Sequence, residues 1–361
     1  MNPTSEIRDD VPPSVRALSF LSPGAAGTVL CAFSALFYSL ASICLRQMSE
    51  LQYDRAFQIA IKETVTVLIV APWLIQKVVR RKGWSINNCR VSAANSPGRH
   101  EVRPERCKSY CWTGTKTLGT TWKLVGLMIF AGVLTQLVGN MGQIHSLGTV
   151  GLTRTIPVIF AVMLVAGALL GRLFLKERIT IRSIGAIAVL IVSILLLQQT
   201  AHADAEPVSS SGLLSQGLGA AALSGLTYAI LAVTIRYVMK AGMHQGVVMI
   251  MTTGIGTLSL GILGGCRTGF AELAQISPEH WRIILASGIF NFLGFLSLTF
   301  GLSLTRVTRA NVLNSSQVAI TATAGVLLFH EPFGVFLACG ISLTILGIAM
   351  IGRSEPEEFP V

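Results

Sequence analysis

The sequence predicts an all-α integral membrane protein in which ten transmembrane helices form two inverted five-helix repeats. Ten separate apolar stretches are each long enough to cross a bilayer, because about 20 helical residues at about 1.5 Å per residue cover the hydrocarbon core. Charged residues make up 12% of the chain, against roughly 25% in soluble domains. The chain also resembles itself at an offset of about 190 residues, which indicates the repeat.

The ten expected spans follow one another with short polar segments between them. They cover residues 27–46, 56–77, 123–143, 152–174, 181–199, 212–236, 246–265, 282–302, 309–330 and 334–352. We expect the first span to be retained, because Glu6, Asp9 and Pro12 precede it and the basic cap and short apolar core of a signal peptide are missing.

The spans divide the chain into two five-helix units, residues 27–199 and residues 212–352. Tails at residues 1–26 and 353–361 flank these units, and an insertion at residues 83–122 separates the second span from the third. The insertion is rich in arginine, and its Asn, Ser, Pro and Gly predict a basic loop without regular structure.

Lysine and arginine are distributed unevenly between the two sides of the membrane. If the N-terminus is cytoplasmic, 22 of the 28 basic residues fall on the cytoplasmic side. The positive-inside rule therefore places both termini and the insertion in the cytoplasm. Segments that face the anionic membrane surface account for the net charge of +11, so the lipid bilayer rather than nucleic acid is the expected partner.

Matching segments carry the internal repeat. Residues 33–38 (Phe-Ser-Ala-Leu-Phe-Tyr) align with residues 223–228 (Leu-Ser-Gly-Leu-Thr-Tyr), and Arg46 then falls on Arg236. Because five is an odd number, the two units enter the membrane with opposite polarity. Inverted repeats are typical of alternating-access transporters, whose substrate site lies near the midplane between the repeats. We therefore expect a cavity lined by the first, third, fourth, sixth, eighth and ninth spans.

Two further sets of motifs are similar to a known family. Gly151-Leu-Thr-Arg-Thr-Ile-Pro157 with Leu175-Lys-Glu-Arg-Ile-Thr180 resembles one EamA-type domain, and Val307-Thr-Arg-Ala-Asn311 with Phe329-His-Glu-Pro332 resembles a second. Two such domains make the ten-helix permeases of the drug/metabolite transporter superfamily. The resemblance implies export or exchange of small metabolites or drugs without ATP hydrolysis, and it favours a bacterial-type inner membrane. The long insertion departs from the typical member.

Glu63 is the acidic residue that stands out, because the other 16 of the 17 lie in tails, loops or helix ends. It sits about seven residues into the second span. A carboxyl group at this depth could bind and release a proton or meet a cationic substrate, and it could equally form an ion pair with Lys62 or Arg154. Since Lys62 and Glu63 are adjacent, we expect their side chains to diverge and Lys62 to reach outward.

Amide side chains mark two more helix faces. Gln136, Asn140 and Gln143 are spaced four and three residues apart in the third span, and Asn311 and Asn314 lie on one face of the ninth. Amides in a membrane can recognise a polar ligand, and they can also join helices to one another. Both interpretations stay open from the sequence.

The remaining candidates are aromatic or charged. Tyr38 and Tyr228 are repeat equivalents whose rings and hydroxyls suit an amphipathic ligand as well as ordinary packing. Arg154 could hold an anionic substrate at the outer mouth, or anchor its span at the interface. Glu177 and Glu331 precede helices, and an acidic group is favourable near the positive N-terminus of the following helix, so we interpret both as structural.

Several functional classes are not expected. The chain has no G-x-x-x-x-G-K-[ST] phosphate loop and no H-E-x-x-H motif, so we expect no enzyme and no cofactor. The insertion contains Cys89, His100, Cys107 and Cys111, but their spacing matches no common zinc pattern, so we expect no metal site.

Two alternatives to a small-metabolite or drug exporter stay open. The first is exchange of nucleotide sugars or sugar phosphates, which would need a cluster of lysine and arginine deep in the cavity. The second is a membrane scaffold or sensor that transports nothing and acts through its basic insertion. The sequence does not decide the coupling ion, or whether the protein works as a monomer or as a homodimer.

Overall fold

The computed structural model describes residues 23–49, 51, 53–94, 118–177, 181–200, 211–329 and 334–352, and every regular element in these ranges is helical. The helices are α2 (Pro23–Ser49), α3 (Arg55–Ala94), α5 (Leu118–Leu134), η2 (Thr135–Asn140), α6 (Met141–Val150), α7 (Leu152–Leu175), α8 (Ile181–Thr200), α9 (Ser211–Lys240), α10 (Gln245–Arg267), η3 (Phe270–Gln275), α11 (Pro278–Leu304), α12 (Val307–Asn314), α13 (Ser316–Phe329) and α14 (Val335–Gly352). Most of both tails, most of the insertion and Glu331 lie outside the described residues.

Seven helical stretches are long and apolar enough to cross a membrane, which confirms the expected class of integral membrane protein. They lie in α2, α3, the continuous run of α5, η2 and α6, α7, α9, α10 and α11. The other three expected spans fall on α8, on α14 and on the pair α12 and α13, where the apolar helices are shorter. The count of ten spans and the inverted repeat therefore stay predictions.

Three boundaries differ from the sequence-based expectation. The third span does not end at residue 143, because α6 continues to Val150 and the helix stops only at Gly151, whose φ of 82° is a conformation that glycine adopts freely. The ninth span is not one helix, because it breaks at Ser315, whose hydroxyl donates to the backbone carbonyl of Val312 at 2.6 Å and so competes with the helical pattern. The start of the insertion is not a loop, because α3 continues through it to Ala94.

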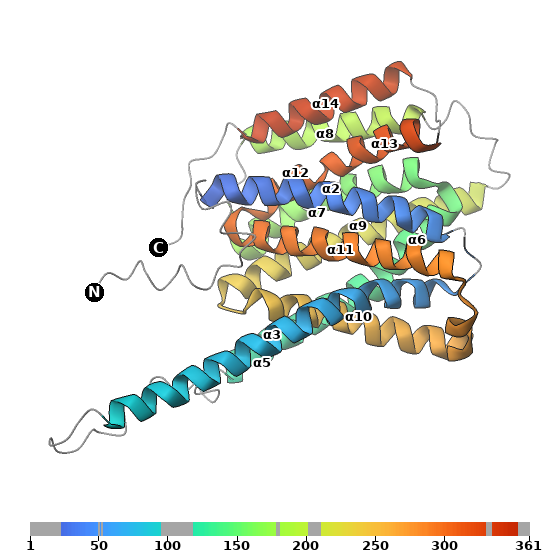
Figure 1. Ribbon diagram of the computed structural model, residues 1–361. Helices are drawn as coiled ribbons and strands as arrows, with labels where there is room; N and C mark the ends of the chain where they lie inside the picture. The colour runs from blue at the N-terminus through green and yellow to red at the C-terminus, as the bar shows by residue number, and fades with distance from the viewer. Residues whose placement is uncertain are drawn as a thin grey trace.

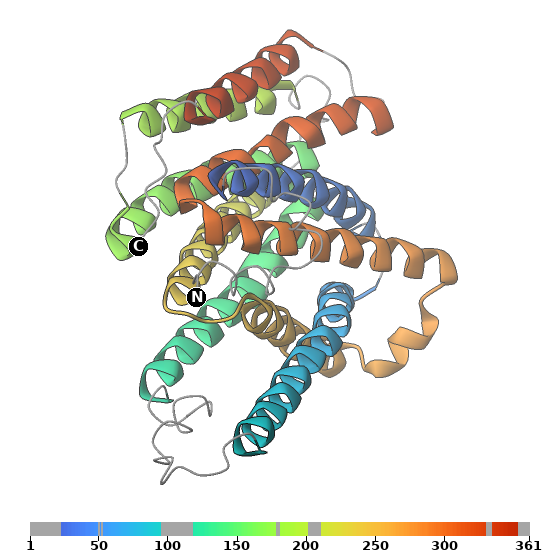
Figure 2. The same ribbon diagram turned by 60° about the vertical axis from the view of Figure 1, so that its left-hand side comes forward.

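The helices form one bundle in which α8 and α14 lie side by side at one flank, while α3 extends beyond the bundle (Figure 1, Figure 2). The most extensive packing joins α2 to α11, α3 to α10, α7 to α9 and α8 to α14. Glycine permits two of these close approaches: a Cβ at Gly225 of α9 would overlap the carbonyl oxygen of Ile159, and one at Gly301 of α11 would lie 2.5 Å from Sγ of Cys31. Small residues at helix contacts are characteristic of membrane bundles.

Candidate functional site

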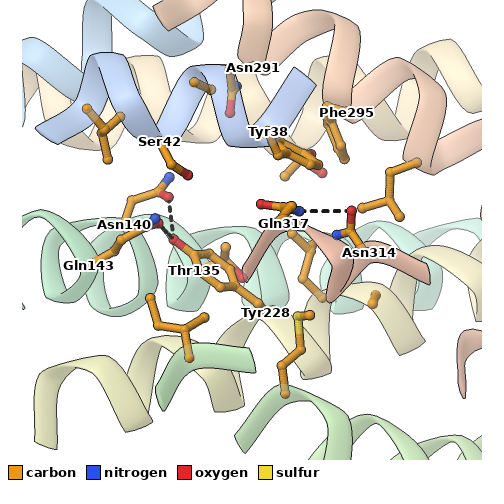
Figure 3. Close-up of a pocket in the computed structure, with 18 of the residues that line it drawn as sticks. Tyr38, Ser42, Thr135, Asn140, Gln143, Tyr228, Asn291, Phe295, Asn314 and Gln317 are labelled. Atoms are coloured by element: carbon orange, nitrogen blue, oxygen red, sulfur yellow. Dashed lines mark hydrogen bonds between the residues drawn. The ribbon is translucent and has the colours of Figure 1, made fainter. Parts of the chain in front are cut away.

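A cavity of about 160 Å³ lies inside the bundle, between the helices of the two expected units. Its lining comes from α2, α7, α9, α11, the run through η2 and α6, and the pair α12 and α13, which are the six spans expected from the sequence. α3 and α10 also contribute, whereas no described residue of α8 or α14 lines the cavity. Figure 3 shows polar side chains that reach into this space from opposite sides.

One side of the cavity carries a connected group of amides around Tyr228. The hydroxyl of Tyr228 lies 2.8 Å from Oδ1 of Asn140 and 2.5 Å from Oε1 of Gln143 (Figure 3). Asn140 in turn donates to Oε1 of Gln136 at 2.5 Å, and Gln136 donates to the carbonyl of Thr252 at 3.2 Å. A phenol carries one hydrogen, so Tyr228 donates to one of the two amide oxygens at a time.

The π-helical turn η2 positions part of this group. Its six residues run from Thr135 to Asn140 inside an otherwise α-helical stretch, and both Gln136 and Asn140 are buried there. A π-helical turn inserts one extra residue and is found frequently at functional sites. The spacing expected for a regular helix is thus altered, but Gln136, Asn140 and Gln143 still line one cavity.

The opposite side carries a second group of amides, where α12 meets α13. Gln317 donates to Oδ1 of Asn314 at 2.9 Å (Figure 3). The hydroxyl of Ser34 lies 3.3 Å from the same oxygen. Asn311 lines the cavity as well, and its Nδ2 is buried against Gly167 of α7 without a hydrogen-bond partner among the described residues.

Aromatic rings also line the cavity. Tyr38 of α2 and Phe295 of α11 both line the cavity (Figure 3). The ring of Tyr38 packs so closely on α11 that a Cβ at Gly294 would lie 3.0 Å from it. The glycine therefore lets the ring lie against the α11 backbone at the cavity wall.

Lys62 and Glu63 form a buried ion pair at the cavity surface, with 3.2 Å between Nζ and Oε1. The side-chain amide of Asn140 lies 3.5 Å from the same carboxylate oxygen. The expectation that Lys62 reaches outward is wrong. The long lysine chain bends back to its neighbour because an unpaired ammonium group inside the bundle would be costly.

Eight of the nine candidate residues line this single cavity, namely Tyr38, Glu63, Gln136, Asn140, Gln143, Tyr228, Asn311 and Asn314. The ninth, Arg154, lies in the first turn of α7, and its side chain is outside the part of the chain that the structure describes. Three further polar residues line the cavity without having been predicted there from the sequence, namely Lys62, Gln317 and Asn291. A signal existed for Asn291, since an amide in the middle of an apolar span is costly unless it has a role.

Glu177 lies at one end of the bundle, away from the cavity lining. Its Oε1 is 2.7 Å from Nε of Arg236 and accepts a hydrogen bond from the backbone N–H of Val307 at 3.4 Å. An acidic group was expected near the N-terminus of the helix that follows Glu177, and the described residues show its carboxylate at the N-terminus of α12. Arg236 also donates to the carbonyl of Leu302 at 2.7 Å. The pair therefore joins the ends of α7, α9 and α11 to the start of α12.

No metal site is evident in the described part of the chain, because no three His, Cys, Asp or Glu side chains gather there in a group that could hold an ion. Cys107, Cys111 and His100 of the insertion, and the side chain of Cys89, lie outside it.

Comparisons with known proteins agree with the architecture. Residues 215–353 match the model of the EamA-like transporter family. A Listeria monocytogenes protein whose name provisionally assigns it to sugar uptake is 24% identical over 225 residues, which cover 60% of this chain and 75% of the relative. These two findings confirm the expected resemblance to the drug/metabolite transporter superfamily.

A solved crystal structure shares the fold with a TM-score of 0.60 at 15% identity, and the match covers 91% of this chain and 96% of the other. At this identity the likeness concerns the fold alone. The family match and the seven apolar helices together indicate a membrane transport protein.

Proposed function

We propose that this protein, whose residues 215–353 match the model of the EamA-like transporter family, is a secondary transporter that moves a small polar molecule across the membrane by alternating access. The observation that carries the proposal is the cavity, which is lined by helices of both expected units and combines polar with apolar side chains inside an apolar bundle. Intramembrane polar groups that face a cavity mark substrate pathways. Transporters of this superfamily are generally not enzymes.

The helix packing supports an inverted repeat. In such a repeat α2 would correspond to α9, α3 to α10, the run of α5 to α6 to α11, α7 to the pair α12 and α13, and α8 to α14. The packing of α2 on α11 then corresponds to the packing of α9 on α5, η2 and α6, and both contacts are extensive. α3 packs on its own repeat equivalent α10, and α8 packs on its equivalent α14. Both contacts are among the most extensive in the bundle.

In the proposed cycle one unit rocks against the other around a site that stays in place. The ion pair of Glu177 with Arg236 would hold one end of the bundle shut in the present conformation. By the positive-inside rule this end faces the cytoplasm, and we propose a bacterial-type inner membrane with both termini inside.

The direction of transport and the coupling ion are parts of the proposal that require their own tests. Export was expected from the resemblance, whereas the name of the Listeria relative suggests uptake of a sugar. Proton coupling through Glu63 is a further prediction. In the present conformation the carboxylate is paired with Lys62, so coupling would require the pair to separate during the cycle.

The decisive experiment is a transport screen in a host stripped of its major exporters. Cells that express the chain are challenged with sugars, amino acids, toxic metabolites and cationic drugs, and internal and external levels are followed in both directions. We expect selective movement of at least one compound. A variant that lacks residues 84–121 separates this function from the scaffold or sensor alternative, because transport that survives the deletion assigns the activity to the helices.

A further inference from the structure

We infer that Lys62 and Glu63 set the charge selectivity of the cavity, so that it accepts uncharged hydrogen-bonding molecules and rejects anions and cations. This inference rests on the proposed function, because it names the class of substrate that the same cavity would take. It assigns to the ion pair a role in selectivity that differs from proton coupling.

The charge balance of the lining is the first step. Among the described residues that line the cavity, only Lys62 and Glu63 carry a formal charge at neutral pH. Their charged atoms are 3.2 Å apart, and their side chains are 6% and 4% exposed. The described lining is therefore neutral in sum, and neither charge lacks a partner.

The second step is the cost of adding a charge. Inside a membrane protein, ionised groups pair with one another, because an uncompensated charge is poorly solvated there. A phosphate, carboxylate or ammonium on the substrate would find no free counter-ion in the described lining, and it would compete with an ion pair that is already complete. Phosphorylated sugars and nucleotide sugars, one of the alternatives left open by the sequence, therefore fit this cavity poorly.

The third step is what the lining can bind. The two amide groups, one around Asn140 and one around Asn314, face the space from opposite sides, and every amide offers both donors and an acceptor (Figure 3). Tyr38 and Phe295 provide ring faces beside them. A volume of about 160 Å³ corresponds to roughly ten water-sized groups. An uncharged molecule of about the size of a monosaccharide, with hydroxyl or amide groups on two sides, matches these features.

The test uses proteoliposomes that contain the full wild-type chain, with radiolabelled probes matched in their carbon skeleton. Glucose is compared with glucuronate, glucose phosphate and glucosamine, the last measured below neutral pH, and uridine is compared with uridine monophosphate. We expect an uncharged probe to be transported at least about tenfold faster than its charged matches. Transport of a charged probe as fast as its uncharged match would overturn the inference and leave the proposed function standing. Transport of no probe would contradict both.

Two single variants test the role of the pair itself. Lys62→Gln leaves the lining with one negative charge, so we expect the transport rate of glucosamine to rise relative to that of glucose. Glu63→Gln leaves one positive charge, so we expect the transport rate of glucuronate to rise relative to that of glucose. The assignment would be contradicted if both variants came to favour probes of the same charge, or if neither variant changed its preference.

The controls separate charge from folding. The double variant Lys62→Gln with Glu63→Gln restores a neutral lining, so the preference for uncharged probes should return. Glu279→Gln alters an exposed carboxylate in the first turn of α11, outside the described lining, and should keep the wild-type preference. Gel filtration shows which variants fold. If a single variant does not fold, the double variant and the wild-type panel still decide the question.

Discussion

Arg236 and Glu177 form a largely buried ion pair that bridges two helix ends, with 2.7 Å between Nε and Oε1 and side chains 12% and 5% exposed. Arg236 lies near the end of α9, and Glu177 lies two residues after the end of α7. The same carboxylate caps α12 through the N–H of Val307, so the loss of one side chain would affect three helices.

We expect Glu177→Gln to lower the thermal stability of the detergent-solubilised protein. The substitution leaves the guanidinium of Arg236 buried without its counter-ion, and breaking a buried pair by removing one partner costs about 3–5 kcal/mol. Light scattering or fluorescence during heating measures the shift. The matched control is Glu279→Gln, whose carboxylate is exposed. Equal melting temperatures for the two variants would show that the pair contributes nothing measurable to stability.

The sequence predicted most of the candidate site because polar residues stand out in apolar spans. Gln136, Asn140 and Gln143 were recognisable from their spacing alone, and the structure brings them to one cavity. The π-helical turn through Gln136 and Asn140 was not predictable, because it depends on how the helix packs against its neighbours and not on the composition of its six residues.

Two other features depended equally on tertiary contacts. Lys62 was expected to point outward, since adjacent residues on a helix diverge, but the long chain bends to Glu63 and forms a buried ion pair. Glu177 was expected to act on the helix that follows it, and the described residues show its carboxylate at the N-terminus of α12, 130 positions further along the chain. Helical spacing identifies which residues share a face, but it cannot show which distant helix end comes close.

We expect Tyr228→Phe to weaken substrate binding more than it slows the transport cycle. Loss of the hydroxyl removes the hydrogen bond that orients Asn140 or Gln143 at the cavity. An unpaired buried acceptor costs about 1–3 kcal/mol, which corresponds to roughly 5- to 150-fold in an equilibrium constant. Initial rates over a range of substrate concentrations would show a raised KM with a smaller change in maximal rate. Tyr237→Phe is the control, because Tyr237 lies on the same helix, is exposed and does not line the cavity. A similar change in both variants would rule out a specific role for Tyr228.

We expect Gly225→Ala to destabilise the packing of α9 on α7. The added Cβ would overlap the carbonyl oxygen of Ile159, and backbone cannot move aside as a flexible side chain can, so the cost is about 1–3 kcal/mol. Gly219→Ala on the same helix is the control, because its Cβ would meet nothing within 4 Å. Thermal melts of both variants test this prediction. A melting temperature of Gly225→Ala at or above that of the control would contradict the close approach of the two helices.

We expect Glu63→Gln to slow transport of the physiological substrate and to flatten its dependence on a pH gradient. If Glu63 takes up a proton during the cycle, protonation releases Lys62 and breaks the pair that now joins them at 3.2 Å. The amide cannot be protonated at ordinary pH, so the variant stays in a single charge state throughout the cycle. Proteoliposomes with and without an imposed pH gradient provide the measurement, and the double variant Lys62→Gln with Glu63→Gln removes the effect of leaving Lys62 unpaired. A Glu63→Gln variant with the wild-type rate and pH dependence would rule out proton coupling through this residue, and its pairing with Lys62 and the proposed role in charge selectivity would remain.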